Sequence, residues 1–189
     1  MNILHHWYCR TDGWRKNMHQ YMPRTLKGID LGDHLLEIGP GPGVTTDWLR
    51  EHVPQLTAIE IDSGLAASLR ERLEGANVTV VEGDATKMSF PDDSFSSAVS
   101  FTMLHHVPSA ELQDRLLSEA CRVIRPGGML AGSDSTPSLR WNLLHVFDTR
   151  VPCDPETFPG RLEAAGFTDV GVATYPGGFS FRGRKPAAA

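Results

Sequence analysis

LLEIGPGPGV, residues 35–44, is the stretch that decides the fold of this chain. An apolar run ends in glycines at positions 39, 41 and 43, and Val44 then opens a helical pattern. A second apolar run ends in Glu60, 17 residues after the last glycine. Parallel α/β sheets bind nucleoside-bearing ligands at such corners, outside the carboxyl ends of their strands. The stretch therefore predicts an α/β fold with a ligand site at the glycine turn.

The spacing of the glycines argues against a ligand that carries a pyrophosphate. A dinucleotide fingerprint reads G-x-G-x-x-G, and Val44 stands where its third glycine would be. Pro40 and Pro42 carry no N–H, so the turn offers few donors to a phosphate. No phosphate-binding G-x-x-x-x-G-K-[ST] loop occurs in the chain. For the motif alone, a glycine-rich turn that binds nothing remains the alternative.

Length and composition predict one domain with one core. A chain of 189 residues with 40% hydrophobic content can bury a sizeable core but leaves little room for two domains. The net charge is −5 and most Lys and Arg residues lie near the two ends, so we expect no nucleic-acid partner. Three cysteines without C-x-x-C spacing predict neither a disulfide framework nor a zinc site, and we expect no metal.

No targeting or membrane-spanning pattern is visible in the sequence. Residues 1–17 contain Trp, Tyr, Asp and Arg where a signal peptide would need an unbroken apolar core. No apolar run approaches the length that spans a bilayer. We therefore expect a cytoplasmic protein without a membrane contact, and the cysteine usage favours the same reducing compartment.

Strand and helix patterns alternate along the chain. Strand-like runs occupy 35–38, 57–61, 78–82, 95–100, 129–133, 170–174 and 179–182. Helical patterns occupy 44–51, 65–73 and 112–124, and a last helix is expected from 154–155 to Gly166. We expect Asp62 or Ser63 and Ser109 to cap two of these helices, and only partial helix over 85–94. Alternation predicts a parallel sheet with helices on both faces. Only residues 175–178 separate the last two strands, so these strands must form an antiparallel hairpin.

Five segments together carry a family resemblance. They are Glu37–Gly43, Ala58–Asp62, Glu82–Ala85 followed by Phe90–Phe95, Met103–Pro108 and Arg122–Gly128. In this order and spacing the chain resembles the class I S-adenosylmethionine (SAM)-dependent methyltransferases, particularly small-molecule enzymes similar to those of ubiquinone and menaquinone biosynthesis. The resemblance implies a Rossmann-like sheet of seven strands, mostly parallel, with the methyltransferase domain at 30–189. Residues 1–29 match less securely and are expected to form an N-terminal helical lid or extension.

The resemblance implies a SAM site at the carboxyl ends of the strands. The predicted cofactor contacts are Glu37, Gly39, Gly41, Gly43, Glu60, Ile61, Asp84, Ala85 and Thr102. Glu60 can accept from both ribose hydroxyls, because a carboxylate accepts through two oxygens. Asp84 is placed to accept from the adenine amino group, with the Ala85 amide facing a ring nitrogen and Ile61 covering one face. The alternatives are helix-capping acids at positions 60 and 62 and an ordinary turn aspartate at position 84.

Two histidines just past the fourth strand are the candidates for catalysis. The methyl group of SAM is already activated, so the protein mainly has to align an acceptor with it. A base is needed only where the acceptor must lose a proton, and His106 or His105 could serve because imidazole titrates near neutral pH. The alternative is a pair of ordinary loop histidines. Asp134 and His145 are further candidates.

The N-terminal segment carries an aromatic cluster for which two roles are open. Its members are Trp7, Tyr8, Trp14 and Tyr21. Aromatic faces attract cations, so a leading helix with these rings could close over a sulfonium as a lid. Packing against the sheet edge or against a second copy of the chain is the equally open alternative.

The sequence thus predicts a SAM-dependent methyltransferase that acts on a small-molecule acceptor. Its short lid would leave the pocket open or completed by another copy, so a homodimer remains an option. Two other functions remain as alternatives: a SAM-binding sensor or assembly protein without catalysis, and a nucleotide-dependent oxidoreductase. Val44 and the two prolines disfavour the oxidoreductase.

Overall fold

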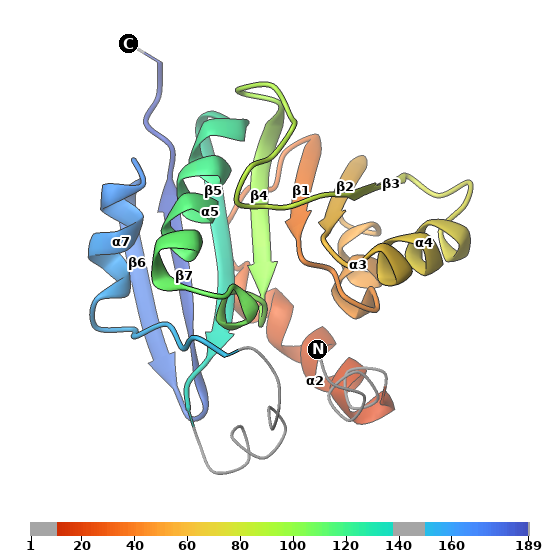
Figure 1. The fold of residues 1–189 in the computed structure, drawn as a ribbon, viewed down its shortest axis with the longest axis horizontal. Helices are drawn as coiled ribbons and strands as arrows, with labels where there is room; N and C mark the ends of the chain where they lie inside the picture. The colour runs from red at the N-terminus through yellow and green to blue at the C-terminus, as the bar shows by residue number, and fades with distance from the viewer. Residues whose placement is uncertain (1–10, 138–149, 189) are drawn as a thin grey trace.

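The computed structural model of the chain describes residues 11–137 and 150–188. In these residues one seven-stranded sheet has helices on both faces (Figure 1). The strands are β1 (His34–Ile38), β2 (Gln55–Glu60), β3 (Val78–Glu82), β4 (Phe95–Phe101), β5 (Ile124–Ser135), β6 (Thr168–Tyr175) and β7 (Gly178–Arg184). The helices are α2 (Asp12–Thr25), α3 (Val44–Leu49), α4 (Ser63–Arg72), η1 (Leu104–His106), α5 (Ala110–Val123) and α7 (Phe158–Ala164).

The strand order is β3-β2-β1-β4-β5-β7-β6, and only β7 runs antiparallel to its neighbours. The chain moves from β1 outward to β2 and β3, then returns to the other side of β1 for β4. This reversal makes the carboxyl ends of β1 and β4 the switch point at which open α/β sheets bind ligands. The predicted Rossmann-like sheet and its terminal hairpin are confirmed.

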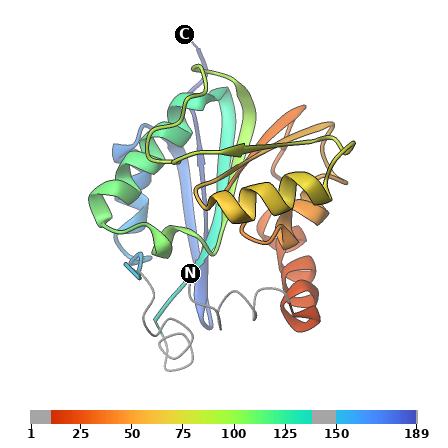
Figure 2. The same cartoon turned by 45° about the vertical axis from the view of Figure 1, so that its right-hand side comes forward.

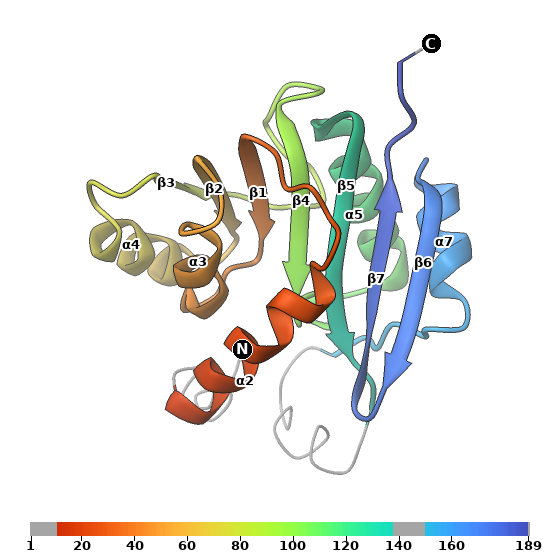
Figure 3. The same cartoon turned by 180° about the vertical axis from the view of Figure 1, so that it is seen from behind.

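Two apolar layers hold the sheet. Leu35 and Leu36 are neighbours on β1 and both are 0% exposed, because alternate residues of a strand face opposite sides. Leu35 packs with Met22 of α2 and Leu49 of α3, while Leu36 packs with Leu116 of α5. Figure 3 shows α2 and α3 on one face of the sheet, with α5 and α7 on the other.

Three local features differ from the sequence-based expectations. The last helix begins at Phe158 rather than at 154–155, because Asp154 closes a preceding turn in which it accepts from the Glu156 and Phe158 amides. Strand β5 starts earlier than predicted, at Ile124. The stretch between β3 and β4 contains no helix (Figure 2), and Asp84 starts it with a turn around Thr86. The predicted caps Asp62 and Ser109 accept from Leu65 N and Leu112 N, at 2.9 and 3.2 Å.

The described part of the N-terminal segment packs on the sheet. Met18 and Met22 of α2 are buried in the same cluster as Phe101 of β4. Tyr21 contacts Tyr175 of β6, with ring centroids 4.8 Å apart. Trp7 and Tyr8 of this segment lie outside the described residues, so its closure as a lid stays a prediction. The further catalytic candidate His145 also lies outside them. None of the helices in the described residues is long and apolar enough to cross a membrane.

Candidate cofactor and active site

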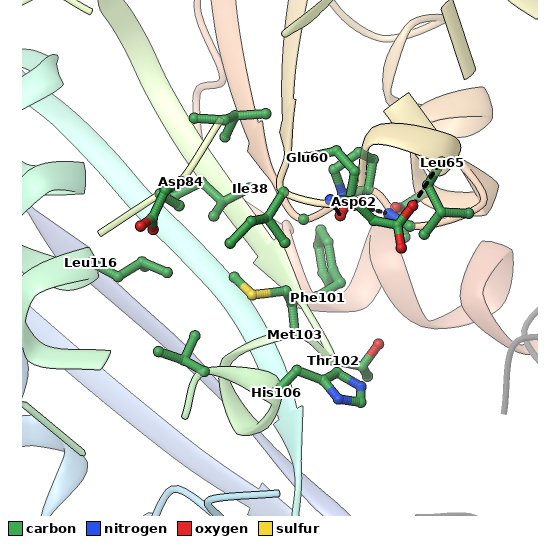
Figure 4. A pocket seen from close by; sticks show the side chains of 18 of the residues that line it. Ile38, Glu60, Asp62, Leu65, Asp84, Phe101, Thr102, Met103, His106 and Leu116 are labelled. Carbon is green, nitrogen blue, oxygen red and sulfur yellow. Dashed lines mark hydrogen bonds between the residues drawn. The ribbon is translucent and has the colours of Figure 1, made fainter. Parts of the chain in front are cut away.

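A cavity of about 310 Å³ opens at the carboxyl ends of β1, β2 and β4 (Figure 4). Eight of the residues predicted for the site line it: Gly39, Gly41, Glu60, Ile61, Asp84, Ala85, Thr102 and His106. Glu37, Gly43 and His105 do not line it. In Figure 4, Glu60 and Asp62 lie on one side of the cavity and His106 on another.

Every backbone N–H of the glycine loop, residues 39–43, donates a hydrogen bond within the protein. Gly39 N donates to Ile59 O, Gly41 N to Glu60 Oε2 and Gly43 N to Pro40 O, each at 3.0 Å. The two residues between these glycines are prolines and have no N–H. Residues 39–43 therefore present no free backbone donor, whereas pyrophosphate sites depend on such donors.

The three glycines serve different purposes. Gly39 has φ +68°, and a Cβ there would lie 2.2 Å from Met103 Cγ, so this glycine lets the turn after β4 pack on the loop. Gly43 has φ +84°, and its Cβ would lie 2.4 Å from Leu69 Cδ1 of α4. Only Gly41, with φ +55°, faces open space. Gly43 is thus needed for helix packing rather than for ligand approach.

Glu37 lies behind the loop instead of in the cavity. It shares the α3 face of β1 with Leu35, since residues two apart in a strand point the same way. Its carboxyl accepts from the hydroxyls of Thr45 and Thr46, the latter at 2.7 Å. Complete burial raises the pKa of Glu37 to about 7. The residue therefore ties β1 to the first turn of α3, and a direct ligand contact stays a prediction.

Glu60 is both a loop anchor and a cavity wall. Its Oε2 accepts from Gly41 N and its Oε1 from Asp62 N, each at 3.0 Å. A carboxylate has about four lone-pair sites, so two bonds leave acceptor capacity on the cavity side. Asp62 caps α4 and also lines the cavity.

Asp84 and Ile61, which were predicted to contact an adenine, both line the cavity. Asp84 Oδ1 accepts from Thr86 N and Thr86 Oγ1 at 2.9 and 2.8 Å, so the residue does make the turn considered as an alternative. Its Oδ2 lies 3.9 Å from Lys87 Nζ, and the side chain stays 30% exposed. Ile61 is 70% exposed although it is large and apolar. Such a side chain at a cavity mouth suits a flat apolar ring.

The charge of the cavity wall has one sign. Its ionised side chains are the carboxylates of Glu60, Asp62 and Asp84, and none of the described lining residues is Lys or Arg. Lys87, near Asp84, has a side chain that is 80% exposed and does not line the cavity. A wall of this kind attracts a cationic ligand and repels phosphates.

The turn after β4 closes the opposite side. Thr102 has φ +50°, which is rare for a β-branched residue, and it lines the cavity with Met103 and His106. His105 points away from the cavity, is 2% exposed, and bonds to Asp134 through Nδ1. The structure thus separates the two candidate histidines, because His106 lines the cavity and His105 does not.

Several wall residues were missed by sequence reasoning. They are Met18, Thr45, Asp62, Leu65, Phe101, Met103, Val107 and Leu116. Most are apolar side chains that also belong to core clusters, so their pattern marks burial and carries no separate signal for a site. In the described residues, no group of three or more His, Cys, Asp or Glu side chains could hold a metal ion.

Comparisons with known proteins point to one family. A family model described as "Methyltransferase domain" matches residues 36–132. The chain is 30% identical over 135 residues to an uncharacterized methyltransferase of Mycobacterium tuberculosis, covering 70% of this chain and 66% of that one. It is 42% identical over 95 residues to a probable ribosomal RNA small subunit methyltransferase A of Haloarcula marismortui. That match covers 48% of this chain and 32% of the relative, so the chain spans about a third of the relative's length.

The fold is shared with solved methyltransferases. Haemonchus contortus phosphoethanolamine N-methyltransferase 2, in complex with phosphomonomethylethanolamine and S-adenosylhomocysteine, superposes with a TM-score of 0.77 at 17% identity. The superposition covers 97% of this chain and 56% of that one. At this identity the likeness shows the fold alone.

One expectation from the sequence is wrong. We expected no nucleic-acid partner, but several relatives are named for ribosomal RNA as their substrate. The physical reason is that the spread of Lys and Arg along a sequence tests only for an extended basic surface. It does not test which molecule presents the acceptor atom at a cavity.

Proposed function

Since the chain belongs to the methyltransferase domain family, whose model matches about half of it, we propose that it transfers the methyl group of SAM to a small-molecule acceptor. Membership confirms the resemblance to class I SAM-dependent methyltransferases that the sequence carries, with SAM as the methyl donor of that family. The acceptor is the part of the proposal that membership leaves open.

One observation carries the choice of ligand: the cavity wall has three carboxylates, no Lys or Arg among its described residues, and a loop without free N–H groups. SAM carries a sulfonium, so a negative wall favours it over a pyrophosphate-linked coenzyme. We assign the ribose hydroxyls to Glu60, the adenine amino group to Asp84 and one adenine face to Ile61. When bound, SAM supplies an activated methyl group, and the chain's own task is alignment and exclusion of water.

The space left beside SAM supports a small acceptor. The cavity of about 310 Å³, at the low end of the ~300–1,000 Å³ typical of ligand pockets, has to hold SAM as well, so little volume remains for an acceptor. The cavity wall also contains the apolar side chains of Met18, Phe101 and Val107, which suit a compact apolar molecule.

A nucleobase of RNA is the second candidate acceptor. The relatives named for ribosomal RNA favour it, with identities of up to 46% over the matched segment. Those matches cover 48% and 40% of this chain, so they support the shared methyltransferase domain more directly than the acceptor.

Calorimetry followed by a methyl-transfer screen tests the proposal. We expect SAM and S-adenosylhomocysteine to bind and NAD and NADP not to bind; the reverse would establish the oxidoreductase alternative. Radiolabelled SAM would then be offered with a panel of phenols, alcohols, amines and thiols, and separately with small-subunit ribosomal RNA. Label in the small-molecule panel supports the proposal, and label only in RNA replaces the acceptor class. SAM binding without transfer to any acceptor favours the sensor.

A further inference from the structure

A buried carboxylate that no ligand role explains lies at the end of β5. Asp134 is 0% exposed and accepts from the backbone N–H of His105 at 3.0 Å and of Ser135 at 2.7 Å. It also bonds to Nδ1 of the His105 ring, and among the described residues no Lys or Arg forms an ion pair with it. Because an ionised carboxylate only accepts, Nδ1 must carry the hydrogen. Asp134 therefore sets both the backbone and the ring orientation of His105.

The turn that contains these histidines is held at further points. Thr102 N donates to Ser133 O at 2.8 Å, Gln113 Nε2 to Leu104 O at 3.0 Å, and Val151 N to His105 O at 2.8 Å. Thr102 keeps its φ of +50° under these bonds. Strained backbone of this kind persists only where the surroundings over-determine it, and it gathers at functional sites.

His106 is the histidine of this turn that lines the cavity. Its ring lies 4.2 Å from the His105 ring, centroid to centroid, with the planes tilted by 43°. His105 thus packs between a fixed carboxylate and the imidazole on the cavity wall. We infer that Asp134 and His105 are positioning residues, which hold His106 as the base for an acceptor that carries a hydroxyl group.

This inference rests on the proposed function and narrows its acceptor class. A hydroxyl oxygen is a weak nucleophile until its proton leaves, so a positioned base accelerates its methylation. The acceptor oxygen bonds to the methyl carbon, the carbon–sulfur bond breaks with its electron pair on sulfur, and the hydroxyl proton passes to a His106 ring nitrogen and then to water. The apolar walls and the absence of Lys and Arg among the described lining residues favour an uncharged acceptor.

The other titratable groups around the pair are silent near neutral pH. Burial raises the pKa of the Cys153 thiol to about 12, and burial with the neighbouring Tyr21 raises the pKa of Tyr175. Arg161 of α7 is engaged by Gln113 Oε1 at 2.9 Å and by Asp114. Glu37, whose pKa is raised to about 7, also titrates in the neutral range, so only the part of a pH-dependent rate that His106→Gln removes is assigned to His106.

The test is a double-mutant cycle on His106 and Asp134, with a hydroxyl acceptor from the phenol and alcohol panel. His106→Gln should lower kcat by about 100-fold or more and abolish the fall in rate at acid pH. Asp134→Asn should lower kcat by about tenfold or more while the SAM dissociation constant stays within about twofold. The double variant should be no slower than His106→Gln alone, because Asp134 acts through His106. Additive losses, or an unchanged kcat for Asp134→Asn, would overturn the inference.

Two further variants keep the test decisive if Asp134→Asn does not fold. His105→Asn places an amide donor where Nδ1 stands and should retain much of the activity, whereas His105→Leu should not. Nitrogen NMR of the imidazoles with S-adenosylhomocysteine bound should show one tautomer for His106 in the wild type and a mixture in His105→Leu.

His34→Gln is the matched control, since His34 bonds to Thr57 Oγ1 at the far end of β1. If the wild type does not bind SAM, the proposed function is wrong. If SAM binds normally but the losses in kcat are additive, only this inference is wrong.

Discussion

Single residues at this site each carry two tasks, one toward the fold and one toward the ligand. Glu60 holds the loop through Gly41 N and still faces the cavity. Asp84 makes a turn with Thr86 and also lines the cavity. The sequence presented these tasks as competing alternatives. The structure shows them to be compatible, because a carboxylate has more acceptor sites than either task uses.

Glu60→Ala should weaken SAM binding by about 2 kcal/mol or more, since charge-assisted bonds to ribose and the Gly41 anchor are both lost. Calorimetry with SAM and S-adenosylhomocysteine measures the change. Glu82→Ala is the matched control, because Glu82 ends the neighbouring strand in register with Glu60 and lies outside the cavity wall. An unchanged affinity for Glu60→Ala would remove this residue from the site.

Gly39→Ala should destabilise the protein more than Gly41→Ala. Both positions have positive φ, which costs an L-residue about 1–2 kcal/mol. Only at position 39 does the new Cβ also meet a side chain, Met103 Cγ at 2.2 Å. Urea unfolding measures the difference, and Met103→Ala in the Gly39→Ala background should recover the steric part alone. Equal losses at the two glycines would show that the loop is not held by packing on Met103.

Helices and strands were predictable where the local sequence determines both the apolar run and the residues at its ends. Asp62 and Ser109 cap α4 and α5 as expected, since a side-chain acceptor next to a helical pattern is a local signal. The start of α7 was not predictable from Asp154 and Pro155, because the same residue types open a helix and close a turn. The segment after β3 shows the same limit, since its weak periodicity led to the expectation of a partial helix where the structure has none.

The unit of β1, glycine loop and α3 should respond to pH through Glu37. Its pKa is raised from 4.5 to about 7, so between these values the folded state binds more protons than the unfolded chain and stability falls as pH rises. The full effect is on the order of 3 kcal/mol. Glu37→Gln should remove it, so the variant should gain stability relative to the wild type between about pH 5 and pH 8. Urea unfolding at these pH values measures the gain, and a parallel pH dependence in both proteins would contradict the assignment.

At the scale of the whole molecule, topology was predictable from connection lengths and alternation. The four-residue link at 175–178 was enough to demand the hairpin, and β7 is antiparallel as a result. The site was predictable where strand ends and the turns directly after them determine it. This covers the eight predicted residues that line the cavity, among them Glu60, Ile61 and Asp84. The direction of Glu37 and the separation of His105 from His106 depend on contacts with Thr46 and Asp134, which sequence order does not reveal.

Overall charge gives a last prediction, because the chain carries −5 and three of its carboxylates line the cavity. SAM has a net positive charge from its sulfonium, whereas S-adenosylhomocysteine is a neutral zwitterion. Salt screens the attraction of the negative site for the first ligand only. Raising NaCl from about 20 mM to about 500 mM, where the Debye length falls several-fold, should weaken SAM binding by about threefold or more. Binding of S-adenosylhomocysteine in the same titrations should change by less than about twofold.

Neutralising a wall carboxylate, as in Asp62→Asn, should reduce the salt effect on SAM binding and leave the binding of S-adenosylhomocysteine unaffected. Equal salt dependence for both ligands would mean that the carboxylates act by hydrogen bonding alone and that the field of the cavity does not choose the ligand.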